Sequence, residues 1–149
     1  MRNLVAIAAI AMLAFGATSC KKKGCTDPNS DNYNSEATKD DGTCIYPVIN
    51  MTAAGTSGDI SGGGGTASGS TTFTQNTATL GWDMAQAAST GSFNLTVTDT
   101  DGTVVINRTL TAGSGAQDAS GTSSSGTTGT WTATVTLNQF TGTGDYSFQ

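Results

Sequence analysis

The sequence predicts an all-β protein: an antiparallel sandwich of the immunoglobulin-like or jelly-roll kind, preceded by a small disulfide-closed loop module. From residue 71 onward, apolar residues alternate with polar ones over short runs, which is the pattern of half-buried strands. Only 11% of the 149 residues are charged, glycine, serine and threonine are abundant, and no run has a helical period. The length allows one modest domain with a small appendage.

The first 19 residues have the layout of a secretion signal. Arg2 supplies a positive start, and residues 4–15 form an apolar run too short to span a bilayer as a helix. The sequence Ala17-Thr18-Ser19-Cys20 then resembles the bacterial lipobox, with alanine in place of the usual leucine. The resemblance implies a bacterial lipoprotein of the cell envelope, anchored to the outer membrane through a diacylglycerol on Cys20. An ordinary signal peptide that leaves Cys20 as a free thiol is the alternative.

Residues 20–24 form the expected lipidated tether, in which Lys21, Lys22 and Lys23 follow the anchor directly. Lysines beside a bilayer can add about 1 kcal/mol each by attraction to anionic headgroups, or they can simply keep a tether soluble. They occupy the place where an acidic triplet often directs surface export, which favours a periplasm-facing position. Past Lys23, only two basic residues oppose eleven acidic ones. Such an acidic body disfavours nucleic-acid binding, because phosphate backbones repel it.

Residues 25–47 form the expected loop module. Cys25 and Cys44 enclose 18 residues, and in a secreted chain such a pair is most simply a disulfide worth about 3 kcal/mol. A zinc site would need more soft ligands than a chain without histidine offers. The enclosed segment is polar and rich in carboxylate and amide oxygens, so it suits either a calcium site or a solvated turn structure held by the disulfide.

This segment also carries a resemblance. The strings Cys-Thr-Asp-Pro, Asn-Tyr-Asn and Asp-Asp-Gly-Thr-Cys within residues 24–47 resemble a short module of Bacteroidota cell-surface proteins, related to thrombospondin type 3 calcium repeats. The resemblance implies that Cys25 pairs with Cys44 and that Tyr33 and Ala37 pack the module. It also implies calcium as a cofactor, with the candidate ligands Asp27, Asn32, Asp40 and Asp41.

Residues 48–149 form the expected sandwich. The glycine-rich run 61–65 is interpreted as a linker or a loop, and the polar stretch 113–129 as a long loop. Asp99-Thr100-Asp101-Gly102 between two alternating runs predicts a hairpin turn. The apolar positions of the expected strands are Phe73, Ala78-Leu80-Trp82, Phe93-Leu95-Val97, Val104-Ile106-Leu110, Trp131-Ala133-Val135-Leu137 and Tyr146-Phe148.

The two tryptophans have two interpretations. Trp82 and Trp131 are in phase with apolar neighbours, so the first interpretation is that both anchor the core. The second is that one of them faces outward as a ligand-binding platform for a sugar ring. The Thr-rich opposite face would then supply hydrogen bonds, from Thr132, Thr134, Thr136 and Asn138.

The sequence predicts a protein that is not an enzyme. It lacks histidine, and its cysteines are explained by lipidation and pairing, so catalysis would depend on a carboxylate pair such as Asp83 and Asp145. The leading hypothesis is a lipid-anchored envelope protein that displays a small β-sandwich for binding or packing against another envelope component. The alternative is a carbohydrate-binding lipoprotein of a glycan-uptake system.

Overall fold

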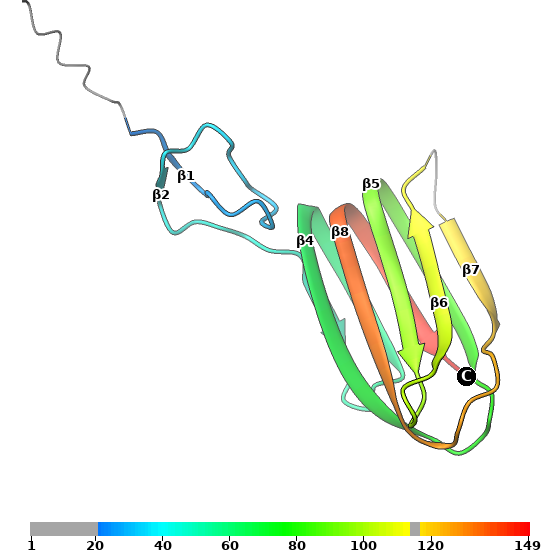
Figure 1. Ribbon diagram of the computed structural model, residues 1–149. Helices are drawn as coiled ribbons and strands as arrows, with labels where there is room; N and C mark the ends of the chain where they lie inside the picture. Colours follow the sequence, from blue (N-terminus) through cyan, green and yellow to red (C-terminus); the bar gives the residue numbers. More distant parts are fainter. Residues whose placement is uncertain (1–20, 114–116) are drawn as a thin grey trace, which may run out of the picture.

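The computed structural model describes residues 21–113 and 117–149, and every regular element in these ranges is a β-strand (Figure 1). The all-β prediction is therefore confirmed. The expected leader and Cys20 lie outside the described residues. Within the described ranges, no helix has the length and apolar character needed to cross a membrane.

The strands form two separate sheets. A small parallel pair precedes one large antiparallel sheet with the order β3-β4-β8-β5-β6, in which β7 also pairs with β5. The bounds are β1 (Lys23–Gly24), β2 (Lys39–Asp40), β3 (Val48–Met51), β4 (Ser57–Gln75), β5 (Gly81–Thr98), β6 (Val104–Thr111), β7 (Gln117–Thr122) and β8 (Gly129–Phe148).

The large sheet folds over on itself to make the two layers of the sandwich (Figure 1). Strands β4, β5 and β8 are 18 to 20 residues long, and each one runs through both layers. The first half of β5 pairs with β7 and the second half with β6. The register between β5 and β8 shifts between Ala88 and Ser92, and that between β4 and β8 shifts between Gly63 and Ala67. These bulges mark the bends, because a bulge kinks and twists a strand.

Two glycines make the bends possible. Gly91 has φ +80°, and a Cβ at this position would lie 2.3 Å from the Gln139 carbonyl oxygen. Gly142 has φ +150°, and its Cβ would lie 2.3 Å from the Ala87 carbonyl oxygen. Both positions therefore need a residue without a side chain, so that β5 and β8 can stay paired while they turn from one layer into the other.

The core lies between the two layers and consists of alternate residues of the strands. Trp131 is fully buried, and its Nε1 donates to the Thr127 carbonyl oxygen at 2.7 Å. The interpretation of Trp131 as a core anchor is confirmed. The buried apolar residues of this core are Ile60, Phe73, Leu80, Met84, Ala88, Phe93, Leu95, Val97, Val105, Ile106, Leu110, Trp131, Ala133, Val135, Leu137, Phe140 and Tyr146.

Two expected loops contain strand. The run 61–65 was interpreted as a linker or a loop, but it lies inside β4 and pairs with β8. Residues 117–122, in the middle of the expected loop 113–129, form β7 at the edge of the sheet. Both interpretations are wrong because backbone pairing needs no side chain, so a run of residues with small side chains can still form a strand.

The predicted hairpin at residues 99–102 is confirmed, and it joins β5 to β6. Asp99 organises the turn. Its Oδ1 accepts hydrogen bonds from the backbone N–H groups of Asp101 at 3.0 Å and Thr103 at 2.8 Å. Its Oδ2 accepts another from the N–H of Thr127 at 2.9 Å, which ties the hairpin to the segment that leads into β8.

We expect Asp99→Asn to lower the stability of the protein in a pH-dependent way. The hydrogen bond from the Thr127 N–H, followed by those from the turn, lowers the pKa of Asp99 in the folded state. A carboxyl group with a lowered folded pKa stabilises the fold above its unfolded pKa of about 3.9, and this contribution disappears as the pH falls through the folded pKa. The free energy of unfolding measured in urea should therefore be lower for the variant than for the wild type near neutral pH, and the two values should converge in acid.

Asp101→Asn in the same turn is the matched control, because Asp101 is exposed. A loss of stability in Asp99→Asn that has the same size at every pH would contradict the conclusion that the ionised Asp99 carboxylate stabilises the fold.

Candidate functional site

The N-terminal module is held by a disulfide and by backbone hydrogen bonds. Cys25 and Cys44 are joined, with an S–S distance of 2.04 Å, so the predicted pairing is confirmed. The Asn34 N–H donates to the Cys25 carbonyl oxygen at 2.9 Å, and the Asp31 N–H donates to the Ile45 carbonyl oxygen at 2.7 Å. Cys25 is buried, whereas Tyr33, which forms an isolated parallel β-bridge with Cys25, is 47% exposed. Ala37 does pack, since it lies against Gly24.

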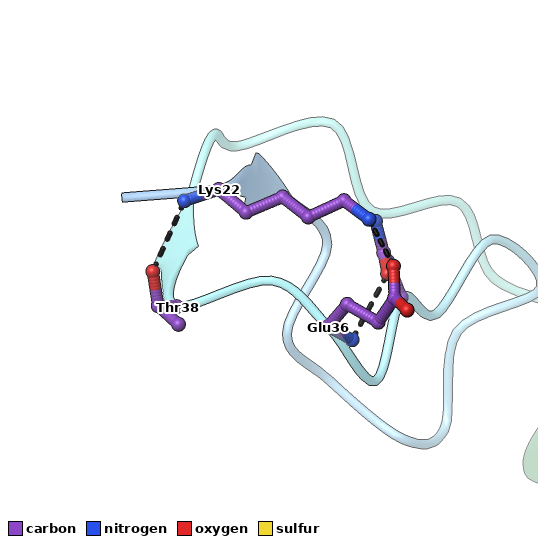
Figure 2. Close-up of polar contacts among 4 residues, drawn as sticks. Lys22, Glu36 and Thr38 are labelled. Carbon is purple, nitrogen blue, oxygen red and sulfur yellow. Dashed lines mark hydrogen bonds and ion pairs between the residues drawn. The ribbon is translucent and has the colours of Figure 1, made fainter. Parts of the chain in front are cut away.

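The module begins at Lys22, within the segment that the sequence assigned to the tether. The Lys22 carbonyl oxygen accepts hydrogen bonds from the N–H groups of Thr38 and Lys39, and the Lys22 N–H donates to the Thr38 hydroxyl at 3.1 Å. The Lys22 ammonium forms an ion pair with Glu36, as Figure 2 shows. Residues 22–24 are therefore part of the folded module.

Two of the predicted calcium ligands lie near the end of the module that faces the sandwich. Asp27 accepts hydrogen bonds from the Asn29 N–H at 2.9 Å and from the Tyr46 hydroxyl at 2.8 Å, and both lower its pKa. The Asn32 side chain accepts from the Ile45 N–H at 2.9 Å and donates to the Thr43 carbonyl oxygen at 2.7 Å. In this structure, these two side chains hold the ends of the loop together.

The other two predicted ligands, Asp40 and Asp41, shape the turn before Cys44. Asp40 Oδ1 accepts from the Gly42 N–H at 3.0 Å, and Asp41 Oδ1 accepts from the Thr43 N–H and hydroxyl at 3.1 and 2.6 Å. The Thr43 hydroxyl is the main cause of the lowered pKa of Asp41. Across residues 21–113 and 117–149, no three acidic, histidine or cysteine side chains come together as a metal site. Calcium binding by the module stays a prediction.

The module docks onto the bend of β4. The Asn29 carbonyl oxygen accepts from the Thr66 N–H at 2.9 Å, and Asp31 Oδ1 accepts from the Gly65 N–H at 2.9 Å. A Cβ at Gly65 would lie 2.4 Å from the Asn29 carbonyl oxygen and 2.8 Å from Pro47 Cδ. The glycine-rich run thus forms the surface that receives the module. No signal in the sequence near Asp31 points to this role.

The outer face of the layer that contains β3 carries a shallow hollow of about 530 Å³. A row of directly paired residues crosses this face from β3 to β7: Asn50, Asp59, Asp145, Ala85 and Asp118. The first four of them line the hollow, together with Ser61, Ala87 and Thr143 from the next row.

The register brings the two aspartates of the hypothetical catalytic pair to this face. Asp83 pairs with Ser147 and Asp145 with Ala85, so Asp83 and Asp145 are diagonal neighbours. Asp59, which the sequence analysis missed, lies directly opposite Asp145. Like charges in this position repel each other. The face is open to water and offers carboxylate and amide groups that can hydrogen-bond to hydroxyls.

The two tryptophans occupy different environments. Because the indole of Trp131 is fully buried, the alternative interpretation of Trp131 as a stacking platform is wrong. Trp82 is partly buried against the core, next to Gly121, whose Cβ would lie 3.1 Å from Trp82 Cζ2. Trp82 lies near the C-terminus, because it pairs with Phe148.

The predicted Thr-rich face is present on the layer that contains β6. The hydroxyl groups of Thr134 and Ser70 are 2.9 Å apart, and those of Thr136 and Ser68 are 3.3 Å apart. Thr132, Thr134 and Thr136 alternate along β8 with Trp131, Ala133 and Val135, which are buried in the core. The structure therefore separates this face from Trp131.

No family model matches the chain, and no curated protein sequence matches it. Among solved structures, one described as "CBM4 structure and function" is 15% identical, with a TM-score of 0.44, over 69% of this chain and 78% of that one. Another, described as TmCBM61 in complex with beta-1,4-galactotriose, is 13% identical, with a TM-score of 0.42, over 69% of this chain and 68% of that one. Similarity this low assigns neither a ligand nor an activity. The chain itself is an antiparallel β-sandwich with a disulfide-closed module at its N-terminal side.

Proposed function

We propose that the protein is a non-enzymatic, lipid-anchored component of the cell envelope that displays its sandwich to another envelope component. The observation that carries this proposal is the way the module joins its neighbours. Lys22 is hydrogen-bonded into the module at one end, and Asn29 and Asp31 bind the bend of β4 at the other. A spacer fixed at both ends holds the sandwich at a set distance from an anchor at Cys20. The exposure of Asp145 supports a role without catalysis, since efficient acid–base chemistry usually needs a site that excludes water.

We expect Cys20→Ser to abolish anchoring. The wild-type mature chain should carry the mass of its acyl chains and fractionate with membranes, because two or three acyl chains make attachment effectively permanent. The variant should remain uncleaved or become soluble, without acyl mass, as measured by intact mass spectrometry and membrane fractionation. Lys21→Gln, one residue beyond the lipobox, is the control that should keep both properties. A Cys20→Ser protein that still fractionates with membranes as an acylated form would contradict the proposal.

The second candidate function is binding of a neutral polysaccharide. Two observations favour it: the hollow offers Asn50, Asp59 and Asp145 as hydrogen-bonding groups, and Trp82 is only partly buried. The test is a binding screen of the mature chain against a polysaccharide panel, with calcium and again with chelator. Loss of binding in Asn50→Ala and Asp145→Ala would identify the hollow as the binding site. Loss of binding in Trp82→Ala would identify the Trp82 indole as part of the site. Asp101→Ala, at an exposed position of the turn between β5 and β6, is the control. Absence of binding under both conditions would retire this candidate.

We also propose that the module binds calcium through Asp40 and Asp41. Both side chains are exposed, and the lowered pKa of Asp41 keeps its carboxylate ionised. We expect calcium to raise the thermal midpoint of the module and the double variant Asp40→Ala with Asp41→Ala to erase this shift, whereas Asp101→Ala in the sandwich keeps it. A melting curve that calcium does not change would leave the disulfide and the turns as the features that order the module.

A further inference from the structure

We propose that the β1–β2 end of the module is a contact surface for anionic lipid headgroups, with Lys23 and Lys39 at its centre. The proposal deepens the proposed function and rests on the anchor at Cys20. It concerns how the folded module meets the membrane, beyond the acyl attachment itself.

The register of the small sheet gathers lysines on one face. Lys23 pairs directly with Lys39, so their side chains point to the same side of the two strands, and both residues are exposed. The next pair, Gly24 and Asp40, points to the opposite side. Lys22 precedes Lys23 in the chain and forms its ion pair with Glu36 (Figure 2). The ion pair neutralises Lys22, while Lys23 and Lys39 present their charge on the face away from Asp40.

The distance to the bilayer is short. Only Lys21 lies between Cys20 and Lys22, whose backbone is hydrogen-bonded to the strand that contains Lys39. A residue spans about 3.5 Å at most. An acylated Cys20 would therefore hold the lysine face within side-chain reach of the headgroups, which occupy several ångströms on each side of the hydrocarbon core.

The charge distribution complements an anionic surface. Residues 48–149 carry six aspartates and only one basic residue, Arg108, so an anionic membrane repels the sandwich. Lys21, Lys23 and Lys39 are attracted at the opposite end, by about fivefold in binding constant per lysine. Asp41 is the acidic neighbour of Lys23; its carboxylate, hydrogen-bonded by Thr43, stays ionised and offsets part of this attraction. Attraction at one end and repulsion at the other orient the module toward the membrane and the sandwich away from it.

The test uses the mature chain with Cys20→Ser, which lacks the acyl group and retains every described residue. Its partition is measured at low ionic strength on vesicles of phosphatidylglycerol and phosphatidylcholine in equal parts, and on vesicles of phosphatidylcholine alone. We expect binding to the anionic vesicles only. Lys23→Gln with Lys39→Gln should weaken this binding about tenfold or more. Glu36→Gln, which frees Lys22, should strengthen it, and Arg108→Gln on β6 should leave it unchanged.

Three outcomes would overturn the proposal: no binding to the anionic vesicles, equal binding to both kinds, or a double variant that binds like its parent. The thermal midpoint of each variant shows that its fold is intact. Because the test chain carries no acyl group, its result is independent of whether Cys20 is acylated in cells. A wild-type chain with acyl mass, together with a test chain that does not bind vesicles, would support the anchor and refute the contact surface. A test chain that binds anionic vesicles, together with a wild-type chain without acyl mass, would support the contact surface and refute the anchor.

Discussion

Gly91→Ala is expected to destabilise the protein by about 3 kcal/mol or more, whereas Gly102→Ala should cost only about 1–2 kcal/mol. The two glycines have nearly the same φ values, +80° and +82°. An alanine would therefore be forced to a positive φ at both positions. The surroundings differ: a Cβ at Gly91 would lie 2.3 Å from a backbone oxygen, whereas a Cβ at Gly102 has no atom within 4 Å.

The measurement is urea unfolding of both variants at the same pH. The difference between them reports mainly the steric cost of the close approach at the bend, because both positions force alanine to a positive φ. Equal losses for the two variants would mean that β5 and β8 can move apart at the bend, and would contradict the close backbone approach at Gly91.

Removing the disulfide with Cys25→Ala and Cys44→Ala is expected to destabilise the module by about 3 kcal/mol and leave the sandwich folded. The described residues of the module contain no apolar cluster to compensate, since its buried residues are Cys25, Ser30 and Pro47. The sandwich has its own continuous core, to which no residue of the module belongs. The module should therefore unfold alone.

Hydrogen exchange resolved by residue tests this expectation. The amides of Asp31 and Asn34, which donate to carbonyl groups across the module, should lose protection, while those of β8 should keep it. Ser35→Ala, at an exposed position of the module, is the control. Loss of protection in both parts would show that docking at Gly65 couples their unfolding.

Local features of the structure could be predicted from the sequence. The hairpin at residues 99–102 depends on Asp and Gly at adjacent positions, and the disulfide depends on two cysteines that enclose a short polar segment. The core positions Phe93, Leu95 and Val97 follow from alternation along one strand. Each of these predictions needs only the residues near it, and the structure confirms each of them.

Features that depend on register could not be predicted. The alternating runs at 131–137 and 146–148 looked like two strands, but they are parts of β8, which continues through the bend at Gly142. The row that places Asp59 opposite Asp145 joins residues far apart in the chain, and only the pairing of β4 with β8 brings them together. In the same way, nothing local to Gly65 indicates that Asn29 and Asp31 bind there.

The passage of β4, β5 and β8 through both layers also determines how the protein would respond to a mechanical load. The module joins the sandwich at the bend of β4, and the C-terminus lies at the opposite end, as Figure 1 shows. A partner that pulls on the far end, against an anchor beside the module, would load these strands along their length. Interstrand hydrogen bonds lie across that direction, so many of them would resist in shear together instead of opening one after another. The folded sheet is therefore suited to bear tension applied between the module and the far end of the sandwich.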